Sequence, residues 1–178
     1  VRSLVLYGTY AKRSHPDDDY PWAPTQEERE RYAQELEESW GEDFDLASIM
    51  PSADAAAVDW MGRRGRASLS PAGARDLILM NSQADVRAVL GSVQCPTLVL
   101  HRSQGEDFYR RDSSEAVAAM IPGSRLVILG EGAPMPYVDP ERVVDEIAEF
   151  LTGARPQKDV DRVLATVLFT DIVGSTEK

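Results

Sequence analysis

The sequence predicts an α/β fold, in which a parallel β-sheet is covered by helices on both faces. Short runs of apolar and β-branched residues predict strands near residues 1–7, 97–101 and 125–129. Helix-like segments follow the second and third of these strands after short connections, as is typical of parallel strands joined by crossover helices. A length of 178 residues with 43% hydrophobic content supplies a core of about one domain.

The first predicted strand, residues 1–7, contains the apolar run Leu4, Val5 and Leu6 and ends at Gly8. No turn or helix cap precedes it, and a buried strand is uncommon at the very start of a complete domain. We therefore expect further residues to precede it in the complete protein.

A polar, proline-broken loop leads into the most charged helix that the sequence predicts. Thr25 is followed three residues later by Glu28, which is the pattern of a capping box, and Gly41 ends the helix. One apolar stripe recurs at helical spacing, formed by Tyr32, Leu36 and Trp40. The opposite face is acidic, which suits a lid packed on another part of the protein.

Further helices are expected over residues 44–90. Ser70 and Pro71 form an N-cap and first-turn pair for one of them. Its predicted buried stripe consists of Ala74, Leu77 and Ile78.

The pattern beyond Cys95 predicts, in order, a strand over 97–101, a helix over 112–121, a strand over 125–129 and a last helix. Asp139 is expected to cap the last helix, with Pro140 at its first position and Gly153 at its end. The residues expected to face inward from it are Val143, Val144, Ile147, Phe150 and Leu151.

Several of these segments follow one another in a characteristic order: VRSLVLYGTYA from residue 1, DYPW from 19, CPTLVLHR from 95, IPGSRLVILG from 121 and EFL from 149. Together they resemble the C-terminal part of an α/β-hydrolase domain, over residues 1–153. The resemblance implies a partial α/β-hydrolase fold, a parallel sheet with helices on both faces. It also implies that residues 11–90 form the helical cap, or lid.

An α/β-hydrolase needs a serine on a G-x-S-x-G elbow, an acid after a later strand and a histidine after the last strand. The chain contains no G-x-S-x-G, which belongs before the first strand. The resemblance places the acid at Glu106 or Asp107 and puts Pro134 at the histidine position. Because proline has no imidazole to accept and return the serine proton, we expect no intact hydrolase site in this chain.

The two histidines and the single cysteine are expected to be structural. We expect His15 to be an exposed loop residue, His101 to be hydrogen-bonded at a strand end, and Cys95 to be a small buried residue. A single cysteine also excludes an internal disulfide and a multi-cysteine metal site, so a cytoplasmic location is expected.

Near the C-terminus, an apolar run from Val163 predicts a buried strand that delivers Asp171 to a glycine turn. The octapeptide FTDIVGST, residues 169–176, resembles the end of the first strand in class III nucleotide cyclase domains. The resemblance implies that Asp171 and the backbone carbonyl of Ile172 bind the Mg²⁺ or Mn²⁺ that carries ATP. Hard oxygen ligands suit such ions. For a shorter match, a plain helix cap at Asp171 would be the favoured interpretation.

The cyclase resemblance covers only the start of that domain, residues 163–178, after a polar linker over 154–162. In that family the second metal-binding aspartate, the purine-binding residues and the transition-state asparagine and arginine all follow the first strand. We therefore expect this chain alone to be catalytically inactive and to need no cofactor of its own. The family also forms its sites between two catalytic domains, which implies a homodimeric parent enzyme.

Charge and hydropathy exclude two classes of partner. The net charge of −11 disfavours binding to nucleic acid or to an anionic membrane, because phosphate groups would be repelled. No apolar stretch approaches the roughly 20 residues that span a bilayer, and the N-terminus lacks the pattern of a signal peptide.

Two functions follow from the sequence. The first is a fragment of a signalling enzyme, in which a degenerate hydrolase-like sensor or scaffold precedes a cyclase that converts ATP to cyclic AMP and pyrophosphate. The sensor would bind a small molecule that the sequence does not identify. The alternative is a lipase- or esterase-like serine hydrolase whose nucleophile lies upstream of this chain. Pro134 favours the first function.

Overall fold

The computed structural model describes residues 1–40, 54–102, 110–130, 136 and 140–155. Its elements, in chain order, are β1 (Leu4–Tyr7), α1 (Gln26–Ser39), α3 (Ala55–Ser68), α4 (Pro71–Ser82), α5 (Arg87–Leu90), β2 (Thr97–His101), α6 (Arg111–Met120), β3 (Arg125–Ile128) and α7 (Glu141–Thr152). The strands predicted near residues 1–7, 97–101 and 125–129 are present, although the first begins at Leu4 rather than Val1. The strand predicted from Val163 lies outside the described residues. Within the described residues, every helix is too short or too polar to span a lipid bilayer.

The three strands form a parallel sheet in the order β1-β2-β3. Leu4 lies opposite Thr97, and Leu98 lies opposite Arg125. The hydrogen bonding continues past the strand ends, where the N–H of Gly8 donates to the carbonyl of Leu100 at 3.0 Å. The central strand, β2, is buried along its whole length.

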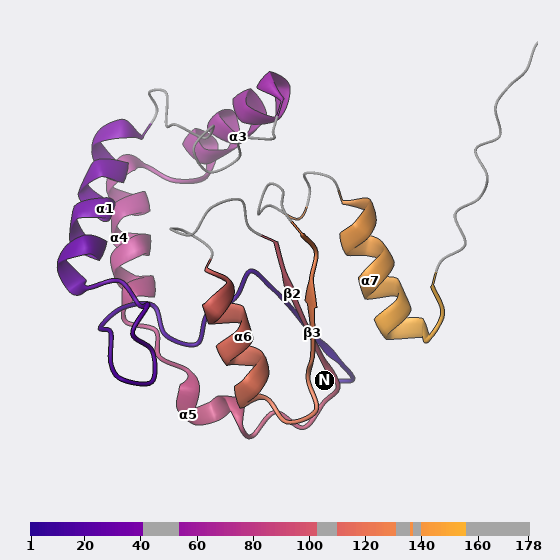
Figure 1. The fold of residues 1–178 in the computed structure, drawn as a ribbon. Coiled ribbons are helices and arrows are strands. Elements are labelled where there is room, and N and C mark those ends of the chain that lie inside the picture. The colour runs from indigo at the N-terminus through magenta and orange to yellow at the C-terminus, as the bar shows by residue number, and fades with distance from the viewer. Residues whose placement is uncertain (41–53, 103–109, 131–135, 137–139, 156–178) are drawn as a thin grey trace, which may run out of the picture.

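Side chains of β2 alternate between two hydrophobic clusters, as the two-residue period of a strand requires. Val99 packs in one cluster with Val117 and Ile121, from α6 and its C-terminal end. Leu98 and Leu100 pack in the other, with Val143 of α7. Figure 1 shows α6 and α7 on opposite sides of the sheet. The prediction of helices on both faces is therefore confirmed.

Helix α7 buries a narrower stripe than the sequence analysis predicted. Val143 is buried, and Ile147 and Phe150 pack beside it, whereas Val144 and Leu151 are each 57% exposed. The packed positions follow the i, i+4, i+7 spacing of one helix face, and the two exposed residues sit beside that face. Pro140 is the N-cap rather than the first helical residue, and the predicted cap Asp139 lies outside the described residues. Gly153 ends the helix in the left-handed conformation, as predicted (φ +74°).

The described residues between β1 and β2 include the helices α1, α3, α4 and α5, and α1 and α4 pack side by side (Figure 1). The predicted capping box of α1 is present: the N–H of Glu28 donates to Thr25 Oγ1 at 3.2 Å, and the N–H of Thr25 donates to Glu28 Oε2 at 2.7 Å. The predicted cap of α4 is also present, because the N–H of Gly73 donates to Ser70 Oγ at 3.1 Å. These local sequence signals correctly marked where both helices begin.

The buried faces of α1 and α4 differ from the prediction. The buried residues of α1 are Arg29, Ala33 and Leu36, while Tyr32 and Trp40 are only partly buried. In α4, Ala74 is buried but Leu77 is 40% exposed. Each helix packs along a single strip, and Tyr32 and Leu77 lie at the edges of those strips.

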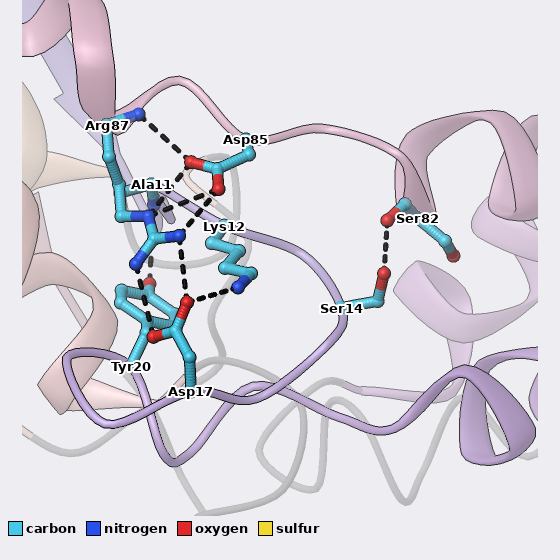
Figure 2. Close-up of polar contacts among 8 residues, drawn as sticks. All are labelled: Ala11, Lys12, Ser14, Asp17, Tyr20, Ser82, Asp85 and Arg87. Carbon is cyan, nitrogen blue, oxygen red and sulfur yellow. Dashed lines mark hydrogen bonds and ion pairs between the residues drawn. The ribbon is translucent and has the colours of Figure 1, made fainter.

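A cluster of charges holds the loop after β1 against the connection between α4 and α5. Figure 2 shows the Arg87 guanidinium between two carboxylates, with Nη2 2.7 Å from Asp85 Oδ2 and 2.9 Å from Asp17 Oδ2. Lys12 pairs with Asp17 from the other side. In the same loop, the N–H of Ala11 donates to Tyr20 Oη at 3.3 Å. Hydrogen bonds from Lys12 and Arg87 lower the pKa of Asp17 from 3.8 to about 2.

This cluster makes stability depend on pH in a defined range. The pKa of Asp17 is lower in the folded protein, so its ion pairs stabilise the fold above about pH 3.8 and are lost as the pH falls towards 2. Asp17→Asn should therefore lower the urea midpoint of unfolding at pH 7, and its difference from the wild type should shrink between pH 4 and pH 2. Asp18→Asn, at the adjacent exposed position, is the control. If the difference in urea midpoint between the wild type and Asp17→Asn stayed constant down to pH 2, this role of Asp17 would be contradicted.

Candidate functional site

A pocket lies where β1 and β2 end, beside the N-terminal end of α6. Its lining residues are Gly8, Thr9, Tyr10, Arg13, His101, Arg110 and Ser113. Its cavity volume is about 10 Å³, which is about the room that one water molecule needs, and it is partly open to solvent. Ligands of open α/β sheets bind at the carboxyl ends of the strands. This strand-end pocket is therefore the candidate functional site.

The backbone at Gly8 helps to shape the pocket. Its φ of +56° lies in the left-handed region that glycine adopts without a steric penalty. The chain turns there, directly after the last residue of β1, and Thr9 and Tyr10 then enter the pocket wall.

His101, the last residue of β2, is a buried residue in the wall of the pocket. It is 2% exposed, and its Nδ1 lies 2.9 Å from Ser114 Oγ of α6. The Ser114 hydroxyl also donates to the carbonyl of Thr9, at 3.5 Å. Burial lowers the pKa of His101, and the positive charge of Arg111 lowers it further. The imidazole is therefore neutral near pH 7, and the hydrogen bond expected for this strand-end residue is present.

The other histidine and the cysteine lie away from the pocket lining. His15 is exposed, as expected, and has a left-handed backbone with φ +61°. Cys95 is only partly buried, so the prediction of a buried cysteine was wrong. It lies in the loop before β2, next to the exposed Pro96, rather than within the buried strand.

The sequence analysis missed the specific contacts of two arginines, Arg13 in the pocket lining and the buried Arg29 of α1. The Arg13 guanidinium lies 4.4 Å from the centre of the Tyr10 ring, and both residues line the pocket. Arg29 of α1 is 5% exposed, and its Nε donates to Ser82 Oγ at 3.0 Å. The spacing of Arg29 with Ala33 and Leu36 was the signal that could have placed it on the inner face of α1.

The residues predicted from family resemblance lie outside the described residues. They are Glu106, Asp107, Pro134, Asp171 and Ile172. Their roles therefore stay predictions. Among the described residues, no three potential metal ligands from His, Cys, Asp and Glu come together.

The chain is similar in structure to several solved hydrolase-fold proteins. An esterase from Exiguobacterium antarcticum matches with a TM-score of 0.73 and 18% identity, over 86% of this chain and 58% of the esterase. A malate-bound esterase from Thermogutta terrifontis matches with a TM-score of 0.62 and 25% identity, over 84% and 55% of the two chains. An enol-lactonase from Burkholderia xenovorans matches with a TM-score of 0.63 and 20% identity, over 85% and 56%. No protein-family model and no curated protein matches the sequence.

These similarities show that the chain has part of the α/β-hydrolase fold, as predicted. The chain spans somewhat more than half the length of each of these neighbours. They lend no support to the predicted cyclase domain.

The bond between His101 and Ser114 can be tested through stability. Ser114→Ala removes the hydroxyl beside a buried imidazole nitrogen and should lower the free energy of unfolding by about 1–3 kcal/mol. Ser113→Ala is the matched control, because the adjacent serine is only partly buried; its effect should stay within about 0.5 kcal/mol. Equal losses in the two variants, measured by urea denaturation, would contradict a specific role for Ser114.

Proposed function

We propose that residues 1–153 contribute the cap and the C-terminal part of a hydrolase-fold domain that binds a small carbonyl compound in the strand-end pocket. Ester hydrolysis is the reaction class that the neighbours support best, since they include esterases and an enol-lactonase. The observation that carries the proposal is a pocket at the carboxyl ends of β1 and β2 with a neutral, buried histidine in its wall.

In this proposal the serine nucleophile comes from a segment upstream of the chain, and Glu106 or Asp107 follows β2 as the acid. The family resemblance puts Pro134 at the histidine position, so in this proposal the serine proton needs another acceptor. His101 lines the pocket and is neutral, which are two properties that a general base requires. Its hydrogen bond to Ser114 fixes the orientation of the ring.

A second function is favoured by a different observation, the octapeptide at residues 169–176. Here the hydrolase-fold part is a sensor without catalysis, and a class III cyclase follows it. Asp171 and the Ile172 carbonyl would hold Mg²⁺ or Mn²⁺, and these oxygen donors suit such ions. The metal, when bound, would neutralise the triphosphate of ATP. Pro134 is compatible with this function, because a sensor without catalysis needs no general base.

The first proposal is tested with a p-nitrophenyl ester and the full-length gene product that contains this chain. We expect turnover above background that a serine-directed inhibitor abolishes. His101→Gln should lower kcat more than it raises KM, because the ring is assigned to proton transfer rather than to binding. Absence of inhibitor-sensitive turnover would overturn ester hydrolysis and leave the sensor as the better account.

The second proposal is tested by the formation of cyclic AMP from ATP in the presence of Mn²⁺ or Mg²⁺. Asp171→Ala in the full-length gene product should abolish that activity, because a metal ligand is lost. Asp159→Ala, in the polar linker, is the matched control and should leave the rate unchanged. Unchanged activity in Asp171→Ala would refute the metal role.

A further inference from the structure

The hydroxyl of Ser114 lies between two groups with which it forms hydrogen bonds. Ser114 is a residue of α6 and is fully buried, with 0% of its surface exposed. Its Oγ lies 2.9 Å from Nδ1 of His101 and 3.5 Å from the carbonyl oxygen of Thr9. A serine hydroxyl has one proton to donate and lone pairs with which to accept. Because a carbonyl oxygen can only accept, the hydrogen bond to Thr9 uses the one proton of Ser114.

The position of the proton on the His101 ring decides whether both hydrogen bonds form at once. If the proton is on Nε2, Nδ1 can only accept, and it takes the Ser114 proton that Thr9 would otherwise receive. If the proton is on Nδ1, the ring donates to Ser114 Oγ, and the hydroxyl donates to the Thr9 carbonyl. The separation of 2.9 Å is the usual length of an N–H···O hydrogen bond. Since a missing hydrogen bond is costly for a buried group, this geometry favours the proton on Nδ1.

A neutral imidazole with its proton on Nδ1 has a lone pair on Nε2. Burial lowers the pKa of His101, which keeps the ring neutral near pH 7. Any group that forms a hydrogen bond with Nε2 must therefore donate the proton. His101 lines the strand-end pocket, whose cavity has room for about one water molecule. A hydroxyl is thus the class of ligand group that suits this ring in both size and hydrogen bonding.

We propose that Ser114 is a positioning residue, which together with the Thr9 carbonyl holds His101 in the tautomer that accepts a hydroxyl proton at Nε2. This inference deepens the proposed function and rests on its assignment of the strand-end pocket as the ligand site. In ester hydrolysis, the upstream serine oxygen forms a bond to the ester carbonyl carbon while the serine proton moves to Nε2. The ester C–O bond then breaks, and Nε2 gives the proton to the leaving alcohol. The Nδ1 proton stays in its hydrogen bond to Ser114 throughout.

The tautomer is measured on the full-length protein with ¹⁵N-labelled histidine, by a long-range proton–nitrogen NMR spectrum at pH 7. This spectrum distinguishes a protonated ring nitrogen from one with a lone pair, and His101→Gln identifies the His101 signals by their loss. The wild type should carry its proton on Nδ1. Ser114→Ala removes the acceptor for that proton, so the ratio of Nδ1–H to Nε2–H should fall about fivefold or more. Ser114→Thr keeps the hydroxyl and should keep the wild-type tautomer.

Kinetics separate positioning from a purely structural role. In the p-nitrophenyl ester assay, Ser114→Ala should lower kcat in proportion to its loss of the Nδ1–H tautomer and leave KM unchanged, and Ser114→Thr should restore kcat. Ser124→Ala is the matched control. The Ser124 hydroxyl donates to the Ala118 carbonyl of α6 at 2.7 Å, and Ser124 is not one of the residues that line the pocket. Its tautomer ratio and kcat should equal those of the wild type.

The outcomes distinguish this inference from the proposed reaction. A proton on Nε2 in the wild type would overturn the inference even if the ester is hydrolysed, and so would a tautomer ratio or a kcat that Ser114→Ala leaves unchanged. The expected change of tautomer without inhibitor-sensitive ester turnover would overturn hydrolysis and support the role of Ser114 in fixing the ring. If Ser114→Ala does not fold, Ser114→Cys replaces it, because a thiol is only a weak acceptor.

Discussion

The burial of strand β2 is the constraint on which the rest of the structure depends. Its residues pair with β1 on one edge and β3 on the other, and all five are buried. Because side chains alternate across a strand, one segment supplies Val99 to the α6 side and Leu98 and Leu100 to the α7 side. A one-residue slip would exchange these faces, so the register is tightly specified. That register also brings His101 to the end of the sheet beside Gly8.

Features encoded by neighbouring residues could be predicted from the sequence, and features that depend on distant partners could not. The Thr25 and Glu28 capping box needs only a spacing of three residues, and the strand of Thr97–His101 needs only its own apolar run. The burial of Arg29 depends on Ser82, which is 53 residues away in the sequence. The spacing of Arg29 with Ala33 and Leu36 pointed to the inner face of α1, but an arginine is rarely buried without a partner, and that partner cannot be identified from the local sequence.

Some residues of the candidate site could likewise be predicted from the sequence, and others could not. The strand-end location of His101 and its hydrogen bond were predictable, because a polar residue after an apolar strand must find a partner. The stacking of Arg13 on the Tyr10 ring in the pocket lining was not, because no local pattern marks which arginine lies over a nearby ring. The acid, Pro134 and the metal position at Asp171 rest on family resemblance alone. The hydrolase-fold neighbours show the fold of the chain.

Ser82 connects three segments that are distant in the sequence. Its hydroxyl accepts from Arg29 and donates to the carbonyl of Ile78, and its own carbonyl accepts a hydrogen bond from Ser14 (Figure 2). The last turn of α4 is thereby joined both to α1 and to the loop that leaves the sheet. A movement of the Arg29 side chain would change its hydrogen bond to Ser82. A movement of Ser82 would in turn change the hydrogen bond that Ser14 donates to the Ser82 carbonyl. The helix pair and the loop after β1 are therefore mechanically coupled through one serine.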